Sequence, residues 1–116
     1  AQMIVSMGHL DRQLLARARL TRALAAQGKL KEASRLRAIV LSALQDAELS
    51  DSISVEIWVQ LAHTAISTEE DRALRGAMAQ VERILALHDA DATMLVAEQE
   101  LSMLRSAVGR SSVPLG

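Results

Sequence analysis

SVEIWVQLAHTAI, residues 54–66, is the segment on which the interpretation of the whole chain depends. It contains the only Trp of a sequence that has neither Phe nor Tyr. Its apolar residues recur three and four positions apart, the spacing that places side chains on one face of a helix: Trp58, Leu61, Ala62 and Ala65. The segment therefore predicts a helix, and the chain on both sides is expected to provide helices that pack against it.

The composition favours an all-α protein. Half of the 116 residues are hydrophobic, mostly Leu and Ala, while Pro occurs once and Gly five times. Helix breakers are therefore rare and strand-forming residues are few. The length suffices for one domain with a modest core. The absence of Cys excludes disulfides and thiolate metal sites and fits a reducing compartment, so we expect a cytoplasmic protein.

The charge balance argues against two classes of partner. Thirteen basic and 14 acidic residues give a net charge of −1, which creates no field to attract nucleic acid or an anionic membrane. No apolar run approaches the roughly 20 residues that span a bilayer. We therefore expect no direct nucleic-acid binding and no membrane association. The chain begins Ala1-Gln2, so either Met3 is a native start or the chain is part of a longer protein.

Helical periodicity predicts five helices. Thr68 is the expected N-cap of the fourth helix and Asp89 or Asp91 that of the fifth, while Gly28 and Gly109 are expected stops. A polar loop is expected before the Trp helix, at residues 48–54. We place the helices at residues 10–27, 30–46, 54–66, 68–88 and 91–109.

The predicted domain organisation follows from these helices. Residues 1–8 are interpreted as a lead-in or a frayed helix start. Residues 1–109 are expected to form one helical domain. The sequence RSSVPLG at 110–116 has no periodicity and is expected to be a mobile tail.

The Trp segment resembles the first helix of a tetratricopeptide repeat, whose pattern is W-x₂-L-G-x₂-Y. Leu61-Ala62 precede Leu95-Val96 by the period of that family, roughly 34 residues, which we call the short spacing. Leu61-Ala62 also follow a similar pair, Leu20-Thr21, but more residues separate these two pairs. We call this larger separation the long spacing. The turn QGKLKEA at residues 27–33 is similar to the turn of such repeats. The chain departs from the family pattern in two places, because Arg37 occupies an aromatic slot and the closing Pro is absent.

This resemblance implies a fold. Helices of such repeats form antiparallel pairs that stack into a right-handed solenoid, so we expect an all-α fold of five helices in a short solenoid of this kind. An up-down helical bundle with the same apolar stripes is the alternative. We also expect Trp58 to be mostly buried between the second, third and fourth helices.

A narrower resemblance is carried by RALAAQGKLKEASRL and the Trp helix together. These segments look like the sensor repeat region of LuxR-type bacterial transcription regulators related to the maltose regulator. The resemblance implies a middle piece that senses a ligand or partner. Neither the ATPase motif nor the DNA-binding helix-turn-helix of that family is visible in the sequence.

The expected function is non-enzymatic recognition of a protein or peptide. Two alternatives remain open: the sensor role just described, and a small secretion chaperone for a helical subunit. The long spacing aligns the first helix with the third, and the short spacing aligns the third with the fifth. In that alignment, one face of these three helices forms a partner-binding groove. The partner-binding residues predicted in this way are Leu15, Ala18, Arg22, Ala25, Glu56, Val59, His63, Ile66, Thr93, Ala97 and Glu100. Among them, apolar residues should supply affinity, and Arg22, Glu56 and His63 should supply selectivity.

Other chemistry is weakly signalled. His9, His63 and His88 lie on separate segments without metal-ligand spacing, so we expect no metal, no cofactor and no catalytic residue. Arg17 and Arg37 project into apolar stripes, where each either extends its head to water or pairs with a carboxylate. The uncovered stripe of the last helix, or the segment Met3–Met7, predicts self-association, with a homodimer as one outcome.

Overall fold

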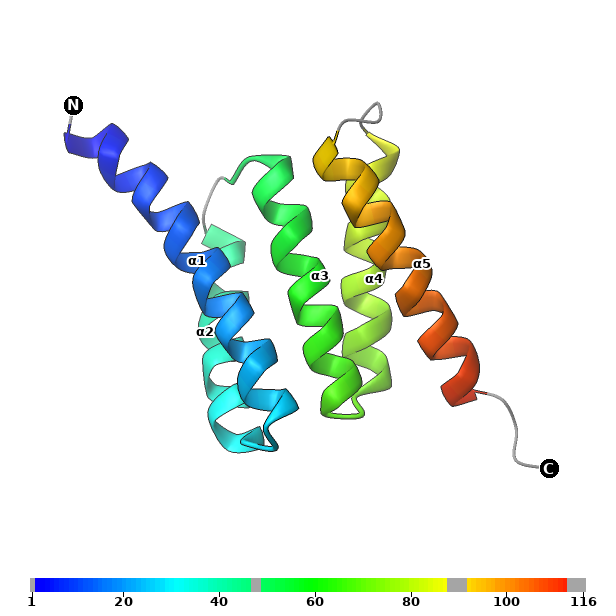
Figure 1. Cartoon of the computed structure of the whole chain (residues 1–116). Helices are drawn as coiled ribbons and strands as arrows, with labels where there is room; N and C mark the ends of the chain where they lie inside the picture. The colour runs from blue at the N-terminus through cyan, green and yellow to red at the C-terminus, as the bar shows by residue number, and fades with distance from the viewer. Residues whose placement is uncertain (1, 47–48, 88–91, 113–116) are drawn as a thin grey trace.

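The computed structural model describes the backbone of residues 2–46, 49–87 and 92–112, and the side chains of residues 11–45, 49–87 and 95–107. All regular secondary structure in this part of the chain is helical, as the sequence predicts (Figure 1). The described helices are α1 (Gln2–Ala26), α2 (Leu30–Asp46), α3 (Asp51–Ser67), α4 (Asp71–Ala86) and α5 (Ala92–Ser112).

The helix ends depart from expectation at both ends of the chain. α1 starts at Gln2 rather than near Leu10, and α5 continues through Gly109 to Ser112. Helix formation there is compatible with the sequence, because the only Pro of the chain is Pro114. The predicted caps Asp89 and Asp91, the segment 113–116 of the predicted tail and the side chains of Met3–Met7 lie outside the described residues.

Two predicted boundary residues have other roles. Ser50 lies inside the expected loop at 48–54, but its hydroxyl accepts a hydrogen bond from the Ile53 amide and caps α3. Thr68, the expected N-cap of α4, instead ends α3, and its hydroxyl donates to the Ala65 carbonyl. The N-cap of α4 is Glu70, which makes no side-chain capping bond.

The turn that joins α1 to α2 has the same structure as the turn that joins α3 to α4. In the first, Gly28 has φ +83° and the Lys29 amide donates to the Leu24 carbonyl. In the second, Glu69 has φ 57° and the Glu70 amide donates to the Ala65 carbonyl. Both are Schellman caps, in which a left-handed residue lets the chain reverse. Because the two turns are separated by the long spacing, the repetition seen in the sequence is also present in the backbone.

Burial repeats with the same period across the two helix pairs. The equivalent buried pairs are Leu14 and Val55, Ala18 and Val59, Ala33 and Leu74, and Val40 and Val81. Each pair occupies matching places in the first and second helical hairpins. The first two hairpins are thus internal structural repeats related by the long spacing.

The alignment of α3 with α5 at the short spacing is wrong. It pairs buried Leu61 and Ala62 with Leu95 and Val96, which are 49% and 59% exposed. The register that pairs Val55 with Ala97 instead matches three buried residues of α3 with three of α5. It also pairs Val59 with Leu101 and Ala62 with Leu104. The sequence match at the short spacing arose because Leu and Ala are frequent in every helix of this chain.

The helices form two layers. α1, α3 and α5 lie side by side in the layer facing the viewer of Figure 1, and α2 and α4 lie behind them. Packing is extensive between α1 and α2, α1 and α3, and α3 and α4, with α5 added against α3 and α4. α3 is therefore the central helix, and it contributes to both hydrophobic clusters of the core.

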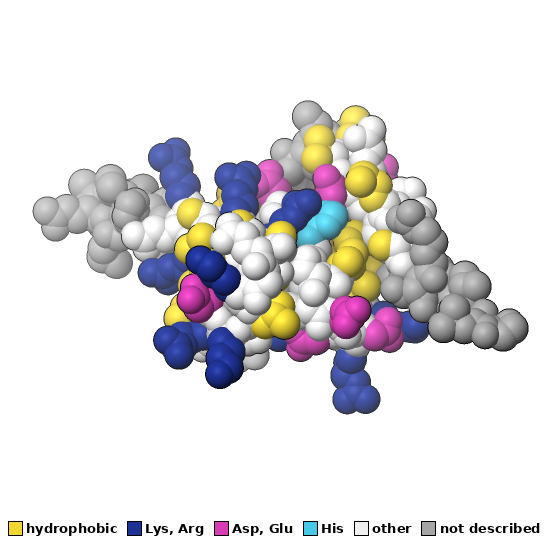
Figure 2. Space-filling view, turned by 60° about the horizontal axis from the view of Figure 1, so that its bottom comes forward, with side chains coloured by type: hydrophobic (Ala, Val, Ile, Leu, Met, Phe, Trp, Pro, Cys, Tyr) yellow, Lys and Arg dark blue, Asp and Glu magenta, His cyan; other side chains and the backbone are white. Residues whose placement is uncertain are grey.

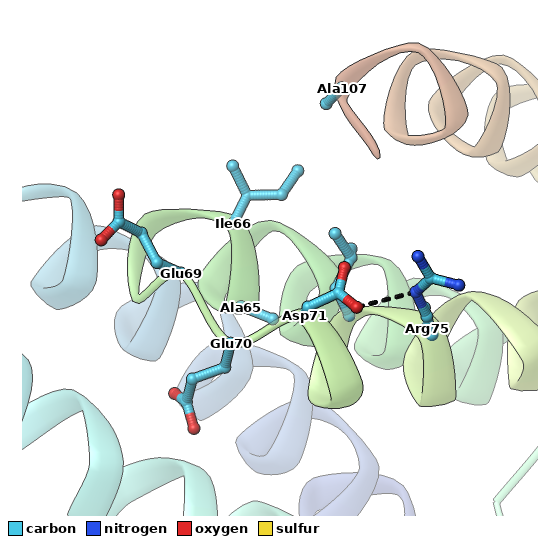
Figure 3. Close-up of a pocket in the computed structure, with 8 residues that line it drawn as sticks. Ala65, Ile66, Glu69, Glu70, Asp71, Arg75 and Ala107 are labelled. Carbon is cyan, nitrogen blue, oxygen red and sulfur yellow. Dashed lines mark hydrogen bonds and ion pairs between the residues drawn. The ribbon is translucent and has the colours of Figure 1, made fainter. Parts of the chain in front are cut away.

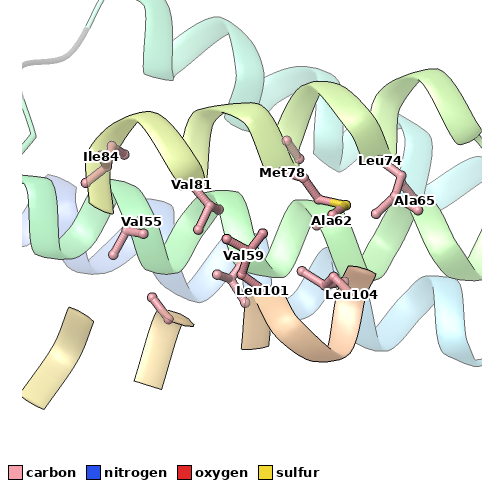
Figure 4. Packing of buried hydrophobic residues seen from close by; sticks show 12 residues of the cluster. Val55, Val59, Ala62, Ala65, Leu74, Met78, Val81, Ile84, Leu101 and Leu104 are labelled. Carbon is pink, nitrogen blue, oxygen red and sulfur yellow. The ribbon is translucent and has the colours of Figure 1, made fainter. Parts of the chain in front are cut away.

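The larger cluster joins α3, α4 and α5, and Figure 4 shows its side chains meeting between these helices. The smaller cluster joins α1, α2 and α3. Trp58 is partly buried and is the one described side chain that packs against both clusters. It also faces residues of α2 and α4, as predicted.

Candidate functional site

The layer of α1, α3 and α5 carries a row of polar contacts between neighbouring helices. Arg19 of α1 approaches Glu56 of α3 at 3.6 Å. One turn further on, Arg22 Nη1 donates to Gln60 Oε1 at 3.2 Å. We call the six residues of this row the polar ladder: Arg19, Arg22, Glu56, Gln60, His63 and Glu100.

The third rung joins α3 to α5. His63 Nε2 lies 2.7 Å from Glu100 Oε2, and because a carboxylate only accepts, Nε2 carries the hydrogen. The His63 side chain is 16% exposed and that of Glu100 is 31% exposed. The ladder is thus reachable from solvent, and its side chains are held in place by partners on the adjacent helix.

A pocket of about 190 Å³ opens beside the ladder, between α1, α3 and α5. Val59 and Ala97 form its apolar wall and Val96 stands at its edge. Its polar rim comes from four ladder residues: Arg19, Glu56, Gln60 and Glu100. The pocket therefore offers an apolar depression surrounded by charges of both signs, which suits one apolar side chain of an amphipathic partner.

A second depression lies beyond His63, where the C-terminal part of α5 faces the turn between α3 and α4 (Figure 3). Ile66 and Ala107 point toward one another across it. Its rim is acidic, with Glu69, Glu70 and Asp71, and Arg75 binds Asp71 at 2.8 Å. The two depressions lie at different positions along α3, so an elongated occupant can reach both.

Charge is unevenly distributed across the surface. In Figure 2 most basic side chains gather over the N-terminal half of the molecule, and acidic ones are more frequent toward the C-terminal half. The His side chain lies between them, beside a basic side chain and hydrophobic ones. α1 contributes Arg12, Arg19 and Arg22 at helical spacing, so the ladder is basic at its α1 edge.

The structure divides the predicted groove residues into two groups. The apolar residues Leu15, Ala18, Ala25, Val59 and Ala97 are buried and belong to the packing between helices. They are core positions rather than an open floor, because the helices of this layer approach closely enough to cover them. Two of these five, Val59 and Ala97, line the pocket beside the polar ladder.

The remaining predicted residues whose side chains are described are accessible. Arg22, Glu56, His63 and Glu100 belong to the ladder, and Ile66 is 37% exposed beside the second depression. The side chain of Thr93 lies outside the described residues. Sequence reasoning missed Arg19, Gln60 and Val96. The first two follow from helical spacing, since Arg19 is one turn before Arg22 and Gln60 one turn after Glu56.

Arg37 forms the carboxylate pair that the sequence left open. Its Nη2 donates to Glu70 Oε2 at 2.9 Å, and its Nη1 lies 2.6 Å from Glu70 Oε1. Hydrogen bonds from Arg37 and Thr68 lower the pKa of Glu70. Desolvation raises this pKa, and the positive charge of Arg37 lowers it further. Arg17, by contrast, is exposed and extends into water.

The described part of the chain bears on two other types of site. It contains no group of three His, Cys, Asp or Glu residues placed to hold a metal ion. None of its helices combines the length and the apolar character needed to cross a membrane. No family model, curated protein or solved structure that we compared with the chain matches it.

Proposed function

We propose that this protein is a non-enzymatic, helical-repeat-like module that binds an amphipathic polypeptide segment across α1, α3 and α5. The observation that supports this most directly is the polar ladder. Its three interhelical contacts hold side chains of both charges in fixed positions beside an apolar pocket. Such pre-arranged groups lose little conformational entropy when a partner binds, and they select its register and orientation.

The charge distribution specifies the partner further. The basic α1 edge favours acidic residues on one side of the bound segment. The two depressions on either side of His63 favour apolar residues about one to two helical turns apart, which an amphipathic helix supplies at i and i+4 or i+7.

The test is selection from a displayed library of amphipathic helical peptides, followed by affinity measurement with fluorescence anisotropy. We expect enriched peptides with an acidic edge, and at least tenfold weaker binding by the double variant Arg19→Glu/Arg22→Glu. The matched control is Arg35→Glu/Arg83→Glu, which changes the net charge equally but lies on α2 and α4. If no peptide is enriched, or both double variants bind alike, the proposal is wrong.

The repeat length favours a second candidate. The long spacing, which takes Leu14 to Val55, exceeds the tetratricopeptide period of roughly 34 residues. Longer repeats are implied by the resemblance to the sensor region of LuxR-type regulators. Under this candidate the same face senses a partner for a DNA-binding domain elsewhere in a longer protein. Sequencing the complete open reading frame tests it: an upstream ATPase and a downstream helix-turn-helix are expected, and their absence removes the candidate.

A further inference from the structure

The two depressions of the proposed binding surface lie along the seam where α3 meets α5. The second of them, at the C-terminal end of α3, has a volume of about 400 Å³. Ile66, which is 37% exposed, and Ala107 face one another across it (Figure 3). The contact between His63 and Glu100 crosses the seam between the two depressions. One segment that lies along the seam therefore reaches both.

Three carboxylates surround the second depression, and two of them already have basic partners. Glu70 binds Arg37, and Asp71 binds Arg75. The carboxylate of Glu69 has no hydrogen-bond or ion-pair partner among the described residues. In Figure 3 Glu69 and Glu70 project from opposite sides of the turn. The rim of this depression therefore has one uncompensated negative charge, at Glu69.

The opposite end of the surface is basic. Arg19 and Arg22 extend from α1 toward α3 beside the first depression. The chain as a whole has the same polarity, because residues 1–50 contain eight basic and four acidic residues, whereas residues 51–116 contain five basic and ten acidic ones. A segment that is acidic along its whole length would be repelled at Glu69, and a basic side chain at that end would be attracted.

We propose that the partner segment is an amphipathic helix with an acidic residue at one end and a basic residue at the other, and that the basic residue pairs with Glu69. This requires the proposed function, namely that a segment binds along the seam. Val59 and Ile66 line the two depressions and are seven residues apart on α3, which is roughly 10 Å or two turns. The apolar residues of the segment are therefore expected at i and i+7. Its charged residues then lie about one turn outside this pair, one at each end.

The internal repeat supplies a variant that removes the charge without straining the turn. Glu69 has φ 57°, and the equivalent residue of the α1–α2 turn is Gly28, with φ +83°. Because Gly adopts this conformation more readily than Glu, Glu69→Gly should fold at least as stably as the wild type. Glu69→Lys keeps a long side chain and reverses the charge. Glu32→Lys, at an exposed position of α2, is the matched control with the same change of charge.

The probe is the tightest-binding peptide from the selection described above, labelled for fluorescence anisotropy. Glu69→Gly should weaken its binding about 2- to 5-fold, Glu69→Lys about 5- to 20-fold, and Glu32→Lys less than about twofold. A second peptide, in which the basic residue at the Glu69 end is changed to Glu, should bind the wild type more weakly than the first. It should regain affinity for Glu69→Lys, because the two charges of the pair are exchanged.

Failure of the proposed function and failure of this inference give different results. If no peptide is enriched, the peptide-binding proposal is wrong and this inference with it. If peptides bind but are acidic at both ends, only the basic end is wrong. The same holds if folded Glu69→Lys binds the probe as tightly as the wild type, or if the second peptide regains no affinity for it. Circular dichroism establishes that each variant is folded.

Discussion

At the scale of single residues, Glu70 links the start of α4 to α2 through its ionised carboxylate. Its folded pKa is lower than its ordinary value of 4.5, chiefly because of the hydrogen bond from Arg37. A lowered folded pKa means that the pair stabilises the fold above the ordinary pKa and that this stabilisation is lost as pH falls through the folded pKa. The Glu70 side chain is 41% exposed, so solvent screening limits the effect to about 1 kcal/mol or less.

Urea unfolding of wild type and Glu70→Gln between pH 7 and pH 3 measures this contribution. The wild type should be more stable at pH 7, and the difference between the two proteins should shrink as pH falls below 4.5. Glu69→Gln, in the neighbouring exposed position, is the control and should follow the wild type. A difference that persists unchanged at pH 3 would show that the carboxylate charge is not its source.

Trp58 is the second residue with a defined energetic role, because it contacts both hydrophobic clusters. Trp58→Ala should lower the free energy of unfolding by about 3 kcal/mol, through lost apolar contact and a larger groove between α2 and α4. Circular dichroism at 222 nm during urea titration measures this without the indole signal. Leu87→Ala, at a position 67% exposed, should change stability by less than about 0.5 kcal/mol. Equal effects of the two changes would mean that Trp58 does not join the clusters.

Residue-level reasoning predicted that Trp58 faces α2 and α4 and that Arg22, Glu56 and His63 are accessible, and it left open whether Arg37 pairs with a carboxylate. These follow from helical spacing and from the cost of burying an unpaired charge. It could not predict which apolar residues of the same face are covered. That depends on how closely α1, α3 and α5 approach, which is set by packing across helices rather than by spacing within one.

At the scale of elements, the two Schellman turns show why one repeat was predictable and the next was not. Gly28 marks the first turn in the sequence, but Glu69 adopts the left-handed conformation of the second without a Gly. The α3–α5 register had no such landmark, and it followed from burial alone. Helix ends were least predictable at the termini, where α1 and α5 extend beyond the expected limits.

α5 should be the least protected of α3, α4 and α5 against amide exchange. It packs on one side only, against α3 and α4, through a stripe that includes Ala97, Leu101 and Leu104. Leu104→Ala should increase hydrogen exchange throughout α5 at least tenfold, because local opening costs less when a buried contact is lost. Met103→Ala, at the adjacent exposed position, should not. Exchange that rises equally in α3 would show that α5 unfolds only with the rest of the molecule.

At the scale of the whole molecule, the two layers separate two kinds of surface. The layer of α1, α3 and α5 presents the polar ladder, and the layer of α2 and α4 leaves an apolar groove floored by Trp58. Because α3 contributes to both surfaces, a substitution in its core is expected to disturb them together. Exposed substitutions on α1 or α4 should affect one surface and spare the other.

The exposed apolar side chains of α5 bear on self-association, which remains a prediction. Leu95, Val96 and Met103 are exposed large apolar side chains on this last described helix. Two copies that pair through these residues would remove them from water, with about 25 cal/mol gained per Å² of apolar surface buried. Sedimentation equilibrium should therefore show a monomer–dimer equilibrium. Leu95→Glu/Met103→Glu should weaken this dimerisation at least tenfold, because pairing would bring like charges together.

The matched control is Leu20→Glu/Leu30→Glu, which adds the same charge at exposed apolar positions of α1 and α2. A wild-type protein that stays monomeric at about 1 mM, where even a weak dimer with a Kd of about 1 mM is substantially populated, would rule out pairing through α5.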